Sequence, residues 1–330
     1  MIPVTKRIQL LCSLGEYMMS DSEGWNEAKH RAVLANSWFT PGNIELSVKS
    51  ITANLLTKEK LNEWLANYTL PVVSKTVGIV MAGNIPLVGF HDFICGFISG
   101  HQLKLKLSSK DEVLIRHLIN KLTEWEHSIA DNVVIADVLK GCDAYIATGS
   151  NNTARYFDQY FGKYPNIIRK NRTSVAVLDG TETNNELSLL ADDIFSYFGL
   201  GCRNVTQICV PEGYDFNQLL DACNKYADLI LHHKYKHNYD YYLAIYLLNK
   251  VPYITNENML LVENQIPFSA VSVLHYRFYN EKNTLLDELR NNTDIQCIVG
   301  RGSIAFGNSQ LPHLTDYADG VDTMQFLCNL

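Results

Sequence analysis

The hydrophobic pattern of the chain changes character near residue 75. Before that point, apolar residues recur at helical spacing between polar ones, for example at Trp38, Ile44, Ile51 and Leu65. This spacing predicts a mostly helical segment over residues 1–70. From Thr76 onward, short apolar runs alternate with helical patterns, which is typical of βαβ units.

The first alternating stretch contains four apolar runs that we interpret as strands, at 76–83 (TVGIVMAG), 102–107 (QLKLKL), 132–137 (NVVIAD) and 143–149 (DAYIATG). Residues 87–100 lie between the first two runs and predict a helix that a glycine closes. A second amphipathic helix follows around Leu118. This order predicts a parallel sheet with helices on its faces.

The second half repeats the alternation. Strands are expected at 174–180 (SVAVLDG) and 205–211 (VTQICVP), with a helix between them that runs through Leu187 and Phe198 and stops at Gly199. Further helices are expected near 237–249 and 282–291, and strands near 259–263 and 270–275. The chain as a whole therefore predicts an α/β protein.

Composition and charge exclude some classes of function. The chain has 330 residues, 47% of them hydrophobic, and a net charge of -7. An acidic balance argues against a nucleic-acid-binding protein. No apolar run approaches the roughly 18 residues that span a bilayer, and charged residues interrupt the N-terminal apolar patch, so we expect a cytoplasmic protein without a membrane span.

The eight cysteines are scattered without a Cys-x-x-Cys pair, which predicts neither a disulfide framework nor a zinc site. Cys95 and Cys209 lie in apolar elements and are expected in the core. His232, His233 and His237 have metal-like spacing, but no carboxylate joins them, so a solvated face is expected and no metal is predicted.

Four short segments carry candidate chemistry: GNIP at 83–86, KLS at 106–108, TGS at 148–150 and GLGC at 199–202. Each is ambiguous alone. GNIP fits an ordinary strand-to-helix turn. The serine of TGS fits either a helix N-cap or a phosphate site at a helix N-terminus. The cysteine of GLGC lies in a helix-to-strand loop, where chemistry is commonly placed.

Taken together, the order and spacing of these segments resemble the aldehyde dehydrogenase superfamily. Its members carry Pro-Trp-Asn-Phe-Pro, Lys-Pro-Ser-Glu, Thr-Gly-Ser and Gly-Gln-x-Cys in the same order, and VENQIP at 262–267 matches their Glu-x-Phe-Gly-Pro. AGNIPLVG, GCRNVTQICVPEGYD and YADGVDTMQFL resemble the fatty acyl-CoA reductase branch, which includes the reductase subunits of bacterial bioluminescence. The likeness runs from about residue 75 to the C-terminus.

The resemblance implies an aldehyde dehydrogenase-like fold with two Rossmann-like α/β domains and an N-terminal helical segment. In this division residues 1–70 pack on the cofactor domain, 71–180 bind the dinucleotide, 181–305 carry the nucleophile and 306–330 form a tail. Cys202 would be the nucleophile that forms an acyl-enzyme. Asn84 and the backbone N–H of Cys202 would donate to the oxyanion.

The resemblance also implies the cofactor site. Lys106 would bind the adenosine ribose, Gly149 and Ser150 the pyrophosphate, and Glu263 the nicotinamide ribose. The family's ribose-binding glutamate is replaced by Ser109, with Lys110 after it. A 2'-phosphate is then tolerated, which favours NADPH with NADH as the second option.

Other departures bear on the reaction. The glutamate that activates water in aldehyde-oxidising members falls near Arg169 here, so the acyl-enzyme is expected to wait for hydride. The sequence thus favours reduction of a fatty acyl thioester to the aldehyde. One rival is an NAD(P)-dependent aldehyde oxidiser. The other is a non-catalytic acyl-holding or partner-binding module, which Gly83 and Leu200 favour because they replace the family's tryptophan and glutamine.

The acyl donor and the partner stay open at this stage. Coenzyme A, a carrier protein and an acylated partner protein are all compatible with the sequence, and the resemblance adds an acyl-protein synthetase as a source of the acyl group. The oligomeric state is undetermined. His313 is a further candidate, as a proton donor to the departing group.

Overall fold

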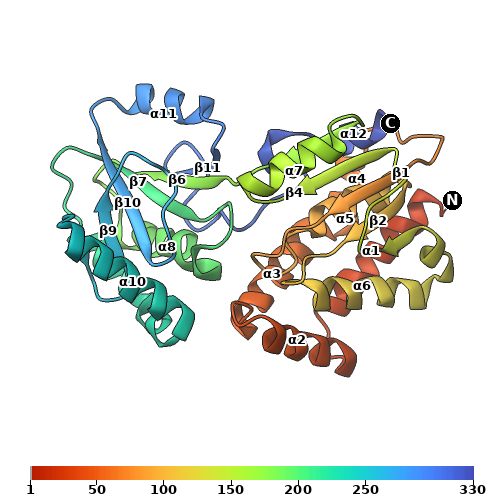
Figure 1. Cartoon of the computed structure of the whole chain (residues 1–330), viewed down its shortest axis with the longest axis horizontal. Coiled ribbons are helices and arrows are strands. Elements are labelled where there is room, and N and C mark those ends of the chain that lie inside the picture. Colours follow the sequence, from red (N-terminus) through yellow and green to blue (C-terminus); the bar gives the residue numbers. More distant parts are fainter. Residues whose placement is uncertain (1) are drawn as a thin grey trace. The chain divides into compact units, whose positions relative to one another are not determined.

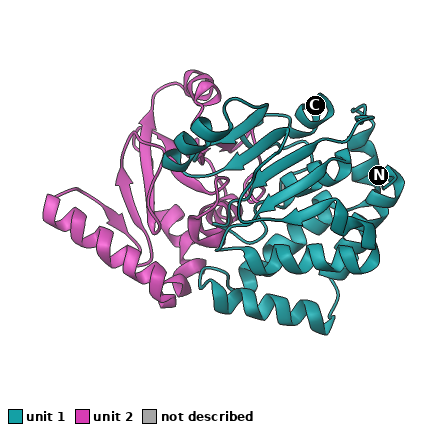
Figure 2. Cartoon of the chain, turned by 45° about the vertical axis from the view of Figure 1, so that its right-hand side comes forward, with its two compact units in different colours: residues 1–171, 311–330 teal, residues 172–310 magenta. Residues whose placement is uncertain are grey.

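The computed structural model describes residues 2–330 and divides into two compact units. Unit 1 comprises residues 1–171 and 311–330, and unit 2 comprises residues 172–310 (Figure 2). Both are built from a sheet and helices. Within the described residues, no helix has the length and apolar character that crossing a membrane requires.

The start of unit 1 is helical, as its apolar spacing predicts. The helices are α1 (Val4–Met18), α2 (Glu23–Ala35), α3 (Pro41–Leu55) and α4 (Lys58–Leu65). Local sequence explains where α3 begins. Thr40 precedes it and accepts a hydrogen bond from the Asn43 backbone N–H, and Pro41 occupies the first turn, where its missing N–H costs nothing.

The sheet of unit 1 is parallel throughout, in the order β3-β2-β1-β4-β5. Its strands are β1 (Thr76–Val80), β2 (Gln102–Lys106), β3 (Val133–Ile135), β4 (Ala144–Thr148) and β5 (Asn166–Arg169). Helices α5 (Phe90–Ser99), α6 (Glu112–Trp125) and α7 (Asn151–Phe161) belong to the same unit. The strand order reverses direction between β1 and β4, where open α/β sheets commonly bind ligands.

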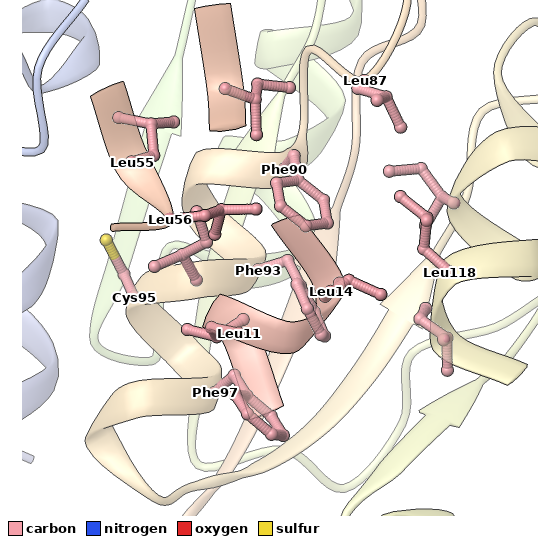
Figure 3. Packing of buried hydrophobic residues seen from close by; sticks show 14 of the residues in the cluster. Leu11, Leu14, Leu55, Leu56, Leu87, Phe90, Phe93, Cys95, Phe97 and Leu118 are labelled. Carbon is pink, nitrogen blue, oxygen red and sulfur yellow. The ribbon is translucent and has the colours of Figure 1, made fainter. Parts of the chain in front are cut away.

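The core of unit 1 joins the N-terminal helices to one face of the sheet. Figure 3 shows Leu11 and Leu14 of α1 among Phe90 and Phe93 of α5, with Leu118 of α6 beside them. A smaller cluster forms around β4 and α7, where the rings of Tyr145 and Phe161 stack with centroids 4.1 Å apart. Helices therefore bury both faces, as a parallel sheet requires.

The C-terminal tail returns to unit 1 and ends in α12 (Thr323–Cys328). Met324 and Leu327 are fully buried in the same core as α1 and α5. Tyr317 accepts a hydrogen bond from the Trp64 indole at 2.8 Å and shares another with Tyr68 at 2.6 Å. The tail thus completes the core of a unit that began more than two hundred residues earlier.

Unit 2 has a second sheet, in the order β11-β6-β7-β10-β9-β8. The strands are β6 (Thr173–Val177), β7 (Val205–Pro211), β8 (Ile254–Thr255), β9 (Leu260–Glu263), β10 (Val273–Tyr279) and β11 (Ile295–Val299). The helices are α8 (Asn184–Phe195), α9 (Asn217–Cys223), α10 (His233–Asn249) and α11 (Lys282–Asn291). All pairings are parallel except that of the edge strand β8.

The two faces of this sheet bury different helices (Figure 1). Leu285 and Leu289 of α11 pack on Val175 and Val177 of β6. On the opposite face, α10 packs Tyr239 against β9 and β10. Short 3-10 helices complete the chain at His127–Asp131, Ser196–Gly199, Asn224–Leu231 and Ala318–Gly320. One parallel sheet and one sheet that is parallel except at its edge strand, both covered by helices, confirm the predicted α/β fold class.

Several predicted boundaries in unit 2 differ from the structure, where β6 ends at Val177 and α10 begins at His233. The helix expected to reach Phe198 ends at Phe195, because Tyr197 and Phe198 adopt left-handed backbone angles that a right-handed helix cannot contain. The strand expected at 270–275 runs from Val273 to Tyr279. The early end of the helix bears on the candidate site because the left-handed residues lie shortly before Cys202, the candidate nucleophile.

Candidate functional site

The carboxyl edge of the unit 1 sheet gathers the predicted cofactor residues of that unit. Val80 at the end of β1 is in register with Lys106 at the end of β2, and β4 ends at Thr148. Because adjacent parallel strands end at one edge, the segments that follow them lie close together. The side chains concerned are exposed to solvent, at Asn84, Lys106, Ser109 and Ser150.

The N-terminus of α7 fits an anion site. Ser150 is its N-cap and accepts a hydrogen bond from the Thr153 backbone N–H at 3.3 Å. A Cβ at Gly149 would lie 3.0 Å from atoms of Thr153 and Phe157, so a larger residue would crowd this turn. The capping prediction for TGS is confirmed, and the helix dipole at this end favours a phosphate as well.

Buried contacts hold the loop that carries Asn84. A Cβ at Gly83 would lie 2.5 Å from the Ser108 hydroxyl, so this position is crowded by the segment after β2. Four residues on from Gly83, Leu87 has a φ of 59° and donates its backbone N–H to Asp111 at 2.7 Å. Burial raises the pKa of Asp111 well above its ordinary value. The loop is therefore fixed by a carboxyl group that the sequence did not single out.

Arg169 is the last residue of β5 and is almost fully buried. Its guanidinium pairs with Asp92 of α5 at 2.5 Å and donates to Thr323 of the tail at 2.7 Å. Burial is the largest single influence and lowers the pKa of Arg169, but the charge and the hydrogen bond of Asp92, with smaller contributions from Asp319 and Cys95, together hold the pKa above its ordinary value. Asp92 is thereby engaged in an ion pair and is not a free base at this position.

Cys202 lies just before β7 in unit 2, on a turn with unusual backbone angles. Tyr197, Phe198 and Gly199 have φ values of 54°, 59° and 75°. Only glycine adopts this region without strain, so both aromatic residues are held there by their surroundings. Cys202 itself is partly exposed, and its carbonyl accepts a hydrogen bond from the Ser174 hydroxyl at 3.0 Å.

The Asn204 side chain, which is fully buried, fastens this turn. It accepts from the Gly201 backbone N–H at 2.8 Å, and its amide donates to the carbonyls of Ser196 at 2.8 Å and Asp193 at 3.0 Å. A longer contact of 3.3 Å reaches the Ile194 carbonyl. One asparagine therefore ties the residues before the turn to those that flank Cys202.

Glu263 ends β9 and is exposed, and the loop after it is bound to β7. Gln207 donates its side-chain amide to the Asn264 carbonyl at 2.8 Å, and Thr206 donates to the Pro267 carbonyl at 2.6 Å. His275 also donates to this loop, and burial lowers its pKa. The strand that begins after Cys202 thus holds the loop that follows Glu263.

The predicted site residues divide between the two units. Unit 1 brings together Asn84, Lys106, Ser109, Gly149 and Ser150, and unit 2 links Cys202 to Glu263 through β7. Sequence reasoning missed Asp111, Asp193 and Asn204. Asn204 stands two residues after the candidate nucleophile, but no local signal in the sequence indicates what Asn204 or Asp193 binds.

The residues set aside behave as ordinary structural groups. Cys95 and Cys209 are fully buried, as predicted. His232 caps α10 by accepting from the Tyr235 N–H. Among residues 2–330 no group of three or more histidine, cysteine, aspartate or glutamate side chains is arranged to hold a metal ion. His313 is exposed, and its backbone N–H donates to Asp316.

The fold is that of aldehyde dehydrogenases. An aldehyde dehydrogenase from Bacillus cereus, in a mutant form, matches with a TM-score of 0.65 at 13% identity, over 91% of this chain and 72% of that one. An aldehyde dehydrogenase from Mycobacterium tuberculosis, complexed with NAD+, matches with a TM-score of 0.63 at 12% identity, over 86% of this chain and 70% of that one.

Sequence comparison is more specific. A long-chain acyl-protein thioester reductase of Photobacterium leiognathi is 21% identical over 200 residues, which are 54% of this chain and 42% of the relative. The chain thus matches less than half of that protein's length. The model of the acyl-CoA reductase (LuxC) family matches residues 14–230, about two thirds of the chain. The chain belongs to the acyl-CoA reductase (LuxC) family.

Proposed function

We propose that the protein reduces a fatty acyl thioester to the aldehyde, with NADPH as reductant and Cys202 as the acyl carrier. The observation that carries the proposal is the turn before β7. A partly exposed thiol follows three left-handed residues in a turn that a buried asparagine fastens, within the region that the family model matches. Strain of this kind gathers where function requires one geometry.

The first step is transfer of the acyl group to the protein. The Cys202 thiolate attacks the carbonyl carbon of the donor thioester, a new carbon–sulfur bond forms, and the bond to the carrier thiol breaks. Asn84 and the Cys202 backbone N–H are assigned to the oxyanion. One such donor is typically worth about 3 kcal/mol of transition-state stabilisation.

The acyl-enzyme must then resist water. In aldehyde-oxidising relatives a glutamate activates water, and here Arg169 stands near that position, paired with Asp92. Neither side chain is available to take a proton from water, since the guanidinium remains charged and the carboxylate is engaged. The acyl group therefore persists on Cys202 until it is reduced.

The residues of unit 1 fit a dinucleotide. The crowded glycine turn and capped helix at Gly149 and Ser150 suit a pyrophosphate, and exposed Lys106 suits a ribose. Exposed Ser109 and Lys110 leave room and positive charge for a 2'-phosphate, which favours NADPH over NADH. A bound nicotinamide would supply the hydride, and Glu263 is assigned to the adjoining ribose.

The division of labour follows the two units. We assign the dinucleotide to unit 1, close to the 71–180 domain expected from sequence, and the nucleophile to unit 2, close to the expected 181–305 domain. The name of the Photobacterium relative favours an acylated protein among the donors, with coenzyme A and carrier proteins as alternatives. A partner acyl-protein synthetase and a cytoplasmic location stay predictions.

One experiment tests the proposal. The protein is incubated with palmitoyl-CoA, with and without NADPH or NADH, and peptide mass spectrometry follows the adduct on Cys202 while chromatography follows the aldehyde. We expect acylation without cofactor and aldehyde with NADPH. Cys202→Ala should abolish both, whereas Cys12→Ala, which changes a partly exposed thiol of unit 1, should abolish neither.

Two other outcomes would replace the proposal. Acylation that NADPH and NADH both fail to convert into aldehyde identifies an acyl-holding module. Absence of an adduct with any acyl donor, together with oxidation of a long-chain aldehyde, identifies an aldehyde oxidiser, the activity of the fold's solved relatives.

A further inference from the structure

The residues that follow Cys202 form a closed ring of hydrogen bonds inside unit 2. Asn204 donates to the backbone carbonyl of Asp193, and the Asp193 carboxylate accepts from the backbone N–H groups of Gly307 at 2.7 Å and Ser309 at 2.9 Å. The Ser309 carbonyl accepts from the Arg203 side chain at 2.5 Å. The ring therefore begins and ends on the two residues directly after Cys202.

Three residues of this ring are fully buried, whereas Arg203 and Gly307 are partly exposed. Asp193, Asn204 and Ser309 are 0% exposed. Burial raises the pKa of Asp193, although its bonds to Ser309 and Gly307 work in the opposite direction. Buried polar groups that satisfy one another in a ring specify a single geometry, because breaking one bond leaves a desolvated partner.

The strained backbone of the turn before Cys202 needs contacts from other residues to maintain it. Tyr197 and Phe198 adopt left-handed backbone angles, which are strained for residues that carry a side chain. Their rings are buried, and Phe198 packs against His232 with centroids 4.6 Å apart. The Asn204 amide binds the carbonyl of Ser196 directly before them, so it opposes relaxation of the strained segment.

We propose that Asn204 is the positioning residue that holds Cys202 in the geometry required for acylation, with Asp193 anchoring it from α8. Ser174 assists from β6 through its bond to the Cys202 carbonyl. Asn204 does not touch the acyl group. The inference deepens the proposed function and rests on it for the acylation measurement alone.

The test changes the donor capacity of Asn204 while keeping its size. Asn204→Asp keeps an acceptor for the Gly201 N–H but replaces the amide donor that faces the Asp193, Ile194 and Ser196 carbonyls. We expect the single-turnover rate of Cys202 acylation by palmitoyl-CoA to fall about 10- to 100-fold, the range that a small misplacement of a reacting group produces. Alkylation by iodoacetamide, which needs no orientation, should change less than about threefold at Cys202.

The chain supplies its own controls. Cys209 and Cys223 are fully buried in unit 2, so their alkylation reports loss of structure, and partly exposed Cys12 and Cys328 of unit 1 report reagent activity. Asn258→Asp is the matched variant, because Asn258 is a buried asparagine of the same unit whose amide donates to the Cys223 carbonyl. It should leave acylation within about twofold of wild type.

Three results would overturn the inference. One is unchanged acylation in Asn204→Asp. Another is a loss of acylation that is matched by the same loss in Asn258→Asp. The third is exposure of Cys209 and Cys223 in Asn204→Asp together with unchanged acylation in Ser174→Ala, the milder variant of the same turn.

Hydrogen exchange separates this inference from the proposed function. The peptide that covers residues 196–204 should exchange faster in Asn204→Asp, whether or not any acyl donor reacts. A wild-type protein that never acquires an acyl adduct ends the proposed function, while slow exchange in the variant ends the positioning role.

Discussion

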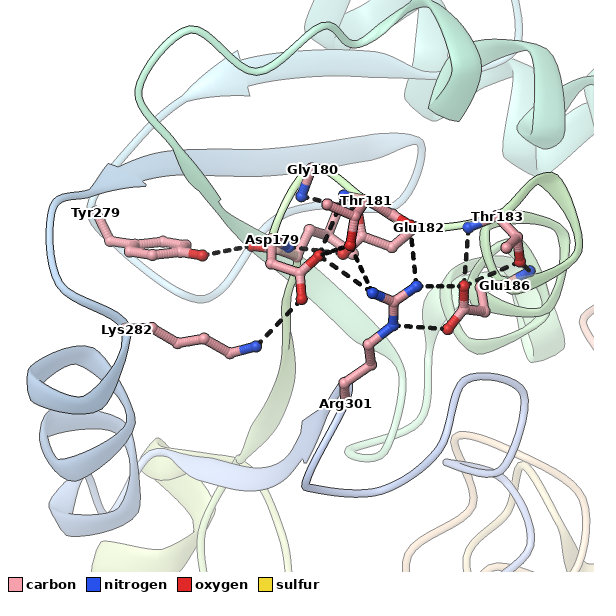
Figure 4. A network of polar contacts seen from close by, with 10 residues as sticks. Asp179, Gly180, Thr181, Glu182, Thr183, Glu186, Tyr279, Lys282 and Arg301 are labelled. Atoms are coloured by element: carbon pink, nitrogen blue, oxygen red, sulfur yellow. Dashed lines mark hydrogen bonds and ion pairs between the residues drawn. The ribbon is translucent and has the colours of Figure 1, made fainter.

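The ends of β5 and β6 both carry an arginine–carboxylate network, and the two differ in burial. In unit 1, Arg169 meets Asp92 with only 3% and 10% of their side chains exposed. In unit 2, Arg301 binds Glu186 and Asp179 with 40% of its side chain exposed (Figure 4). The exposed network has more partners, including Lys282 on Asp179.

The number of ion pairs in a network is therefore a poor guide to how much the network stabilises the fold. Water solvates and screens the charges around Arg301, so losing them changes little. Around Arg169 no water compensates, so a lost partner leaves a buried charge. The buried network also joins β5, α5 and the C-terminal tail.

Breaking the buried pair should have the largest effect on stability. Asp92→Asn leaves the Arg169 charge without its counterion, and we expect a loss of about 3–5 kcal/mol in the free energy of unfolding, measured by urea denaturation. Arg301→Ala, which removes the guanidinium of the exposed network, should lower the free energy of unfolding far less. Similar losses in the two variants would refute the comparison.

The double variant Asp92→Leu with Arg169→Met sharpens the same point. Because it removes both charges, most of the lost stability should return. Persistent instability would mean that the bond from Arg169 to Thr323, and hence attachment of the tail, carries the effect.

Removing a buried carboxyl group that has no cation beside it should have the second largest effect on stability. Asp111→Ala removes the acceptor for the Leu87 N–H, and we expect a cost of about 1–3 kcal/mol in unfolding free energy. Asp111→Asn keeps an acceptor and should cost less. Equal losses would show that the hydrogen bond to Leu87 does not hold the loop.

The pH dependence gives an independent check on Asp111. Its pKa is raised in the folded state, so the folded protein binds the proton more tightly than the unfolded chain. Stability from this group is present below the unfolded value and is lost as the pH rises through the folded pKa. Wild type should therefore lose more stability than Asp111→Asn as the pH rises from 4 towards neutrality.

An exposed residue at the carboxyl edge of unit 1 should affect ligand choice rather than stability. Ser109→Glu places a carboxylate where a 2'-phosphate is proposed, and we expect the ratio of kcat/KM for NADPH over NADH to fall about tenfold with an unchanged Tm. Ser109→Ala is the neutral control. An unchanged ratio would move the 2'-phosphate away from this residue.

Removing Arg301 from the exposed network of Figure 4 should have the smallest effect on Tm, and the effect should be seen only above acidic pH. The bond to Arg301 lowers the pKa of Glu186 to about 2. A lowered carboxyl pKa gives stability that is present above the unfolded value, near 4.5, and is lost as the pH falls towards 2. The Tm difference between Arg301→Ala and wild type should therefore be small at pH 7 and should vanish in acid.

Much of the fold could be predicted because the responsible signals are local. The apolar runs at 76–83 and 205–211 are bounded by glycine or turn residues, and β1 and β7 form within these runs. β5 was not predicted, because Asn166–Arg169 offers only two apolar residues between polar ones, too short a pattern to separate from a loop. Pairing with β4 supplies the backbone partners that hold this short segment as a strand.

The candidate site shows the same limit. A candidate nucleophile and the likeness to the family could be inferred from short motifs in order, and family membership is now established. The residues that support the turn before Cys202 could not be inferred, since Asp193 and Ser309 are more than a hundred residues apart. Nothing local distinguishes a carboxylate that will bind a distant backbone from one that will face solvent.

The sequence by itself determined the alternation of strands and helices, the α/β class and the order of the motifs, because these depend on periodicity and on residues a few positions apart. Only the tertiary structure decided that the tail completes unit 1, that Arg169 is buried against Asp92, and that Asn204 fastens the turn before Cys202. The physical reason is that burial and hydrogen-bond partners are set by residues remote in sequence, which compete for the same interior space.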